Sequence, residues 1–322
     1  MNKLTAVSSA CLLVAVMTYS ALAWHGPGHD KATRCAVEAL PATLPEFFRA
    51  GAETIANTAV DPDLFCRPVA PPELSDTERP EHYLDMEMLD GFPDKKLPST
   101  RYEFLEQVYA KKLKPAQVGL LPWAITEWTQ RLTVAFAEHR KWPEDGAIRA
   151  KCLVYAGLLA HYAEDAAQPL HTTVHHDGRA KAPFEEGSSP KTGIHAKVDA
   201  LIGKLKAANK DIAAEVARDA APTVFEDVFT AAMDELKRSH ALVDRVYELE
   251  KDLPGVDEPF SAKGAGADVE KFARDRLSAA VRFTSSLYLT AWRDSEKIKF
   301  PDWHQRPPAP QDVKSVSSPA GP

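Results

Sequence analysis

Apolar residues recur at three- and four-residue spacing through most of this sequence, and this pattern limits what the chain can fold into. Leu277, Val281, Phe283 and Leu287 are one example. Such spacing places side chains on one face of an α-helix. The pattern predicts helices over residues 30–40, 102–113, 124–139, 147–165, 194–208, 211–219, 223–250 and 268–295. Almost no segment alternates with period two, so we predict an all-α fold built as a bundle of long helices.

The first residues have the order of a secretory signal peptide. Lys3 precedes an apolar stretch, and Ala21-Leu22-Ala23 then supplies a cleavage pattern. A membrane anchor needs about 20 apolar residues, and polar residues at 18–20 interrupt the run. Cleavage between Ala23 and Trp24 predicts a secreted or periplasmic protein. We divide the chain into a signal peptide (1–23), one large helical domain (24–300) and a disordered Pro- and Ser-rich tail (301–322).

Charge and cysteine content narrow the functional classes. The formal net charge is −7, so no global basic field attracts nucleic acid or anionic lipid, and any phosphate affinity must be local. After the signal peptide the chain keeps Cys35, Cys66 and Cys152. A Cys35–Cys66 disulfide with Cys152 buried alone is one possibility in an oxidising compartment, and the sequence does not settle the pairing.

One short motif carries the strongest chemical signal. His161 and Asp165 lie four residues apart, so they point from the same face of a predicted helix. Pro169 disfavours helix in the residue before it, and the helix should therefore end near Gln168. This break moves His171 off the helix axis, toward another position of the same site.

A second pair with the same spacing follows at His195 and Asp199. Either pair alone is more typical of a surface or capping pair. Two such pairs within a short stretch, joined by a histidine just after a proline, favour a metal site. Imidazole and carboxylate are ligands that suit zinc.

With these motifs in place, the chain resembles the superfamily that contains zinc-dependent phospholipases C and the single-strand-specific three-zinc nucleases of fungi and plants (the P-one nuclease type). The resemblance covers most of the chain after the signal peptide, thinly outside the motifs. It implies a single helical domain with a zinc cluster at the base of a cleft. The matching elements occur in the family's order: Trp24, His29, Asp63, His82-Tyr83, His161/Asp165/His171 and His195/Asp199.

The resemblance implies three zinc ions. The first would be held by Asp63, His82, His161 and Asp165. The second would be held by His171, His195 and Asp199. The third would take the free amine and carbonyl of Trp24, His29 and a shared oxygen of Asp165, so that signal-peptide removal would be an activation step.

Two residues and one spacing bear on how well the chain fits the family's ligand pattern. Asp61 lies two residues from Asp63 and is the alternative ligand, and the family's context favours Asp63. Glu164 stands where the family usually has glycine, either on a solvated face or as a partner of a ligand. His82 and His161 are also farther apart than the family pattern, which predicts a helical insertion around residues 100–140 that covers part of the site.

The implied activity is phosphodiester hydrolysis. Zinc lowers the pKa of bound water from 15.7 toward about 7, so a hydroxide shared by two zinc ions can attack phosphorus. Asp63 would be catalytic by orienting or deprotonating the attacking water. Tyr83 and Asp85 match positions that stack on a base and bind its edge in the nucleases, although Tyr83 also fits core packing and the phospholipase branch also has an aromatic there.

We therefore predict a zinc-dependent nuclease or 3′-nucleotidase that acts on single-stranded nucleic acid as a monomer, with no stable protein partner. The alternative is a phospholipase C acting on phospholipid head groups. A second alternative is a non-catalytic zinc-binding helical protein. A metalloprotease is disfavoured because the sequence contains no His-Glu-x-x-His motif.

Overall fold

A computed structural model describes residues 26–90, 92, 97–181, 190–261 and 266–305. The predicted signal peptide, its cleavage point and Trp24 lie outside the described residues, as do residues 306–322 of the predicted tail. Within the described end of the chain, Lys141 donates a hydrogen bond to the carbonyl oxygen of His304. The His304 ring lies 3.1 Å from a carboxylate oxygen of Glu138.

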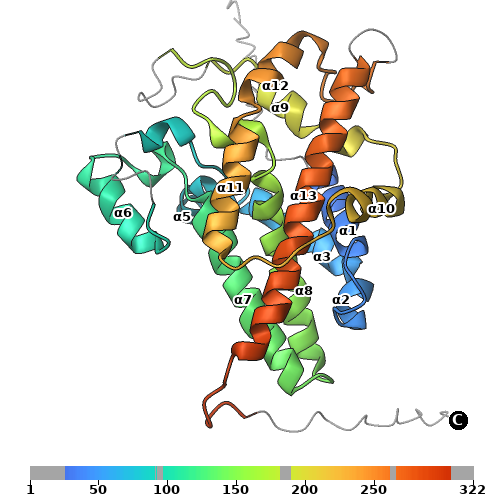
Figure 1. Cartoon of the computed structure of the whole chain (residues 1–322). Helices are drawn as coiled ribbons and strands as arrows, with labels where there is room; N and C mark the ends of the chain where they lie inside the picture. Colours follow the sequence, from blue (N-terminus) through green and yellow to red (C-terminus); the bar gives the residue numbers. More distant parts are fainter. Residues whose placement is uncertain (1–25, 91, 93–96, 182–189, 262–265, 306–322) are drawn as a thin grey trace, which may run out of the picture.

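The described chain is helical, as predicted (Figure 1). Its α-helices are α1 (Gly26–Glu38), α2 (Glu46–Ala50), α3 (Ala52–Thr58), α4 (Asp61–Phe65), α5 (Pro72–Glu78), α6 (Arg101–Ala110), α7 (Leu121–Lys141), α8 (Gly146–Asp165), α9 (Ile194–Asp199), α10 (Asn209–Ala220), α11 (Val228–His240), α12 (Val243–Leu249) and α13 (Gly266–Asp294). Short 3-10 turns include η1 (Arg79–His82), η2 (Met86–Leu89), η4 (Pro115–Gln117), η5 (Pro169–Thr172) and η6 (Ile202–Lys204). Across these residues, extended pairing is limited to an isolated bridge between Leu84 and Gly119.

Two predicted helices are broken in the structure. The segment predicted over 194–208 gives α9 followed by η6, and the segment predicted over 223–250 gives α11 and α12. α11 begins at Val228 because the Asp227 carboxylate accepts a hydrogen bond from the backbone amide of Thr230, at 2.6 Å. A side chain that caps the first turn fixes where a helix starts, and hydrophobic periodicity alone does not predict that start.

The longest helices form the centre of the molecule. α7 packs along α8, and α13 contacts both (Figure 1). The larger apolar cluster contains Phe48, Trp123, Phe136 and Tyr288, and a second cluster joins residues of α1, α9, α10 and α13. Among the described residues, no helix combines the length and apolar character needed to cross a bilayer.

The start and end of α8 follow from its sequence. Asp145 caps its first turn by accepting hydrogen bonds from the amides of Ala147 and Ile148. The helix ends at Asp165, and η5 begins at Pro169, close to the end predicted from the proline. The carboxyl-terminal turn of α8 therefore carries His161 and Asp165, and the chain turns directly toward His171.

Gly157 lets α3 and α8 approach each other closely. A Cβ at this position would lie 2.5 Å from the carbonyl oxygen of Ile55 on α3, closer than real Cβ contacts. Only glycine fits without moving one of the helices. This contact is one helical turn before His161, so it sets the distance between α3 and the residues of the site.

The segment around residues 100–140, predicted to be a helical insertion, forms α6, η4 and α7; that it is an insertion relative to the family stays a prediction. Its turn at 118–121 pairs through the backbone with residues beside His82: Asp85 donates to the carbonyl of Val118 at 2.8 Å, and Leu120 donates to that of Pro80 at 2.6 Å. Gly119 at the centre of the turn has a φ of 91°, a conformation that favours glycine. The insertion thus supports the segment that carries His82.

Candidate metal centre

Three groups of side chains that could hold a metal ion meet at the carboxyl-terminal end of α8. In each group, one ligand atom of every member lies within 4.8 Å of the others, and all members are buried. The groups are Asp63, His82 and His161; His171, His195 and Asp199; and His29, His161 and Asp165. Trp24, predicted to complete the third group, lies outside the described residues. Eight of the nine ligand positions predicted from the sequence are therefore described, and the structure brings all of these together.

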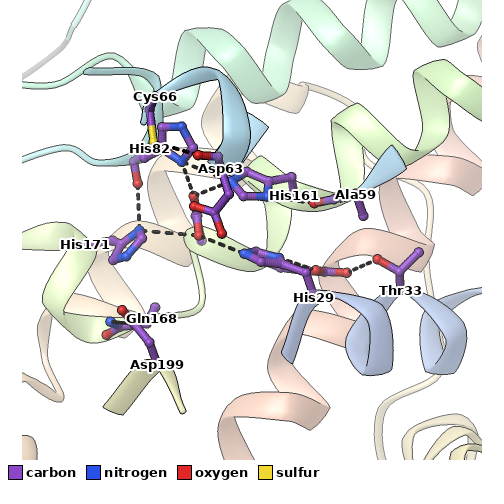
Figure 2. Close-up of polar contacts among 12 residues, drawn as sticks. His29, Thr33, Ala59, Asp63, Cys66, His82, His161, Gln168, His171 and Asp199 are labelled. Atoms are coloured by element: carbon purple, nitrogen blue, oxygen red, sulfur yellow. Dashed lines mark hydrogen bonds and ion pairs between the residues drawn. The ribbon is translucent and has the colours of Figure 1, made fainter. Parts of the chain in front are cut away.

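Asp165 connects the three groups. Its Oδ2 lies 3.1 Å from His82 Nδ1 and 3.3 Å from His161 Nε2. Its Oδ1 lies 3.4 Å from His171 Nδ1 and 3.6 Å from His29 Nε2. These four rings gather around one point in Figure 2. A single carboxylate is thus placed to bridge cations on either side of it.

Backbone carbonyls orient three of the histidine rings. His161 Nδ1 donates to the carbonyl of Ala59 at 2.8 Å, and His171 Nδ1 donates to that of His82 at 2.8 Å. His195 Nδ1 donates to the carbonyl of His176 at 3.2 Å. In each ring this contact leaves Nε2 as the ligand atom that faces the cluster, an arrangement typical of metal-binding histidines.

Ring nitrogens face one another at short distances. His161 Nε2 lies 2.9 Å from His82 Nδ1, and His195 Nε2 lies 3.2 Å from His171 Nε2. Two nitrogens bound to one tetrahedral zinc at ~2.05 Å are separated by about 3.3 Å. The observed pairs are close to that separation, so the residues present fit a zinc ion in each of these two groups.

Asp63 rather than Asp61 belongs to the cluster. Asp63 lies on α4, is 2% exposed, and groups with His82 and His161. Neither of its carboxylate oxygens makes a hydrogen bond within the described part of the chain. Asp61 is only partly buried. The structure therefore agrees with the choice of Asp63 from its sequence context.

Asp199 is held by neighbours on two sides. Gln168 Nε2 donates to Asp199 Oδ1 at 2.7 Å, and Asp199 Oδ2 lies 3.2 Å from His195 Nε2. Asp177 fixes the start of α9, because its Oδ1 accepts hydrogen bonds from the amides of Gly193 and His195, at 2.8 and 3.3 Å. The sequence analysis did not single out Asp177, because it lies 16 residues before Gly193 and no local capping pattern marks it.

The charges of the cluster shift the pKa values of its members. Burial alone would raise the pKa of Asp165, but the charges of His171 and His161 and the hydrogen bonds from His161 and His82 hold it well below its usual range. Burial, followed by the charge of His161, holds the pKa of His29 well below its usual value. The arrangement thus favours an ionised Asp165 with neutral rings at His29 and His171, whose pKa values burial lowers. Burial would also lower the pKa of His82, but its hydrogen bond to Asp165 holds that pKa well above the usual value.

Tyr83 and Asp85 lie next to the cluster. Leu84 between them is fully buried, so the two side chains leave the opposite face of an extended stretch. The Tyr83 hydroxyl donates to the carbonyl of Ala116 at 2.7 Å, which fixes the ring against the turn of the insertion. The Asp85 carboxyl is partly buried, and burial followed by the charge of Glu87 raises its pKa well above the ordinary value.

Two further residues near the cluster were missed from the sequence. Burial raises the pKa of Asp63, and the charge of Arg67, on the segment after α4, is the smallest of the effects that oppose this rise. The ring of His176 packs edge-on against His195, with centroids 6.1 Å apart. No local pattern marks Arg67. His176 is one of two adjacent histidines whose sequence favours solvent-facing side chains over phosphate contacts, and the structure has it partly buried beside His195.

The three described cysteines are all free. Cys35 and Cys152 are buried, and Cys66 lies near Asp63, where its thiol donates to the Asp63 carbonyl oxygen at 3.3 Å. The Cys35–Cys66 pairing considered from the sequence is therefore not formed in this structure.

Comparisons with known proteins give distant matches. No protein-family model matches the sequence. The chain is 26% identical over 216 residues to a probable serine protease of Bradyrhizobium tropiciagri; the match covers 61% of this chain and 26% of that protein, so the chain spans about a quarter of its length. Among solved structures, the fold is similar to alpha toxin from Clostridium absonum, with a TM-score of 0.40 and 15% identity, over 85% of this chain and 66% of the toxin chain.

Proposed function

We propose that this chain is a zinc-dependent phosphodiesterase. The observation that carries the proposal is the Asp63 carboxylate, whose two buried oxygens make no hydrogen bond among the described residues while His82 and His161 lie beside them. A buried ionised carboxylate without a partner is costly, and a cation removes that cost. Imidazole and carboxylate donors at the observed separations suit zinc.

Different residues of the chain would have different roles in hydrolysis. Bound zinc would supply Lewis acidity toward a phosphoryl oxygen and make a water molecule more acidic. Asp63 would accept a proton from the attacking water, and Arg67 would bind a non-bridging phosphate oxygen, because a guanidinium matches the geometry of phosphate. Asp165 would hold the histidine rings in place. No side-chain nucleophile is needed in this scheme.

Carboxylates around the cluster favour a substrate with a cationic part. Glu78 Oε1 lies 4.0 Å from His82 Nε2. Glu87 accepts hydrogen bonds from the Thr173 hydroxyl and the Val174 amide, just beyond His171. A nucleic acid needs several cationic contacts along its phosphates, whereas a choline or ethanolamine group is attracted by carboxylates.

Exposed apolar side chains next to Asp63 also fit a lipid substrate. Leu64, Val69 and Leu74 are 47%, 77% and 40% exposed, and α4, which carries Leu64, packs against α5, which carries Leu74. Apolar side chains beside a site that faces solvent are typical of contacts with a membrane surface. We therefore place a zwitterionic phospholipid first among the substrates, ahead of the nucleic acid favoured by the sequence.

Single-stranded nucleic acid or a 3′-nucleotide is the second candidate. The observation in its favour is that Tyr83 and Asp85 share one face of the segment that follows His82. An aromatic ring contributes roughly 1–3 kcal/mol by stacking on a base, and a neighbouring carboxyl group can bind the base edge. We further propose export and action as a monomer, in line with the signal-peptide pattern.

The test is hydrolysis by the purified chain that begins at Trp24, loaded with zinc. The substrates are phosphatidylcholine and phosphatidylethanolamine vesicles, single-stranded DNA, RNA and a 3′-nucleotide, and the control is His161→Ala. We expect turnover of the phospholipids that is lost in the variant. Turnover of nucleic acid alone would move the protein to the second candidate, and zinc binding without turnover of any substrate would contradict the enzymatic proposal.

A further inference from the structure

Glu164 is a buried carboxylate that the proposed chemistry does not use. It directly precedes Asp165 and is 0% exposed. His29 Nδ1 donates to Glu164 Oε2 at 2.7 Å, and the Thr33 hydroxyl donates to Glu164 Oε1 at 2.8 Å. His29 and Thr33 lie one turn apart on α1, so both oxygens of one carboxylate are held by one helix face (Figure 2).

His29 differs from the other rings of the cluster in what holds its Nδ1. His161, His171 and His195 donate to backbone carbonyl oxygens, whereas His29 donates to a carboxylate. A carboxylate behind a histidine fixes the ring tautomer and makes the opposite nitrogen a stronger ligand. That opposite nitrogen, His29 Nε2, lies 3.6 Å from Asp165 Oδ1 and belongs to the third group.

The charges around Glu164 call for a cation nearby. Its ion-pair contact within the described chain is the His29 ring. Burial raises the pKa of Glu164 well above the ordinary value; the hydrogen bond from Thr33 opposes this rise, and the carboxylates of Asp165 and Asp30 add to it. Two adjacent buried carboxylates are costly unless positive charge compensates them. A divalent ion between His29 and Asp165 would supply that charge.

We propose that Glu164, supported by Thr33, is a positioning residue that orients His29 so that its Nε2 binds a metal ion shared with Asp165. The proposal rests on the zinc centre proposed above and concerns its third group alone. Glu164 acts through its hydrogen bond to His29 Nδ1, so metal binding there depends on a residue that is not itself a ligand.

A purely structural role makes a different prediction. In that case the Glu164–His29 contact ties α1 to α8 whether or not metal is present, and its loss would destabilise the metal-free and zinc-loaded proteins equally. A positioning role predicts that the larger part of the loss appears only with zinc, because Glu164 then acts through the ring that holds the metal ion.

The experiment compares wild type with Glu164→Gln and Thr33→Val, all as full mature chains. Zinc stoichiometry by elemental analysis, zinc affinity by chelator competition, and thermal unfolding in chelator and in excess zinc are measured for each. Thr33→Ser, which keeps the hydroxyl, is the matched rescue. Glu235→Gln removes another buried carboxylate, one that pairs with Arg238 at 2.7 Å on α11.

We expect Glu164→Gln to lower the affinity for one zinc ion by about 10- to 100-fold, while the affinities for the other ions stay unchanged. Thr33→Val should show a smaller loss, and Thr33→Ser and Glu235→Gln none. The zinc-induced rise in melting temperature should shrink in Glu164→Gln without a matching fall in chelator. Wild-type zinc stoichiometry and affinity in Glu164→Gln, or equal destabilisation with and without zinc, would overturn the inference alone. A wild-type chain that binds no zinc would overturn the zinc centre and this inference together.

Discussion

The imidazole of His161 donates a hydrogen bond from Nδ1 to the carbonyl oxygen of Ala59, at 2.8 Å. Ala59 caps the carboxyl-terminal end of α3, and His161 lies on α8. The bond therefore forms only because these two helices approach closely at Gly157. Helix packing and the orientation of a ligand ring are thus coupled at this point.

We predict that Gly157→Ala both destabilises the protein and weakens its metal centre. The added methyl group must push α3 away from α8, and overpacking of this kind costs about 1–3 kcal/mol. The His161–Ala59 bond should lengthen with the shift, and zinc content should fall. Urea unfolding and elemental analysis measure the two effects.

Gly146→Ala is the matched control, because it lies on the same helix and a Cβ there meets nothing within 4 Å. It should retain wild-type zinc content and stability. If Gly157→Ala is as stable and as rich in zinc as Gly146→Ala, the coupling described above is wrong.

We predict that Asp177→Ala lowers the affinity for zinc at the group of His171, His195 and Asp199. The Asp177 carboxylate accepts from the amides of Gly193 and His195, so its loss frees the start of α9 and the ring of His195. Removal of such a supporting contact typically lowers metal affinity by about 10- to 100-fold. Chelator competition on the purified variant measures the change.

Asp227→Ala is the corresponding control, since the Asp227 carboxylate also accepts from a backbone amide at the start of a helix, that of Thr230 on α11. Loss of this cap should cost ~1 kcal/mol of stability and leave zinc affinity unchanged. Equal zinc affinities in the two variants would show that capping at α9 does not support the metal centre.

We predict that Arg67→Gln lowers activity toward phosphodiesters without loss of zinc. The charge of Arg67 acts on Asp63, so the guanidinium lies close enough to the cluster for us to propose that it binds a phosphate oxygen. A charge-assisted hydrogen bond contributes about 1.5–3 kcal/mol, so kcat/KM should fall by roughly 10- to 150-fold. Arg67→Lys should recover part of this loss, and a variant with wild-type kcat/KM would exclude Arg67 from phosphate binding.

The sequence predicts the parts of this protein that depend on local spacing. The pairs His161/Asp165 and His195/Asp199 are visible because four residues span one helical turn, and the long periodic segment at 268–295 is observed as α13. Asp63 and His29 come from other helices, and only the family resemblance connects them with the pairs.

The residues that the sequence does not reveal act through long-range contacts. Glu164 reads as either a solvated or a supporting residue until the structure shows it buried against α1. Arg67 has no local motif. The start of α11 depends on one side-chain cap at Asp227, and hydrophobic spacing does not predict such a cap.

The pH dependence of stability should report the burial of His176. Burial, followed by the charges of His195 and His171, lowers the pKa of the partly buried His176 to about 4, from its ordinary value of 6.5. Between these values the unfolded chain binds a proton that the folded chain does not, so stability falls as pH drops from 6.5 toward 4. The loss from this group is at most about 3 kcal/mol, and above pH 6.5 it is absent.

In chelator, where metal does not compete for His195, urea unfolding of His176→Gln at pH 7.5 and pH 5 should show a smaller loss of stability than wild type. Equal losses in the two proteins would mean that His176 is not the buried neutral ring described here.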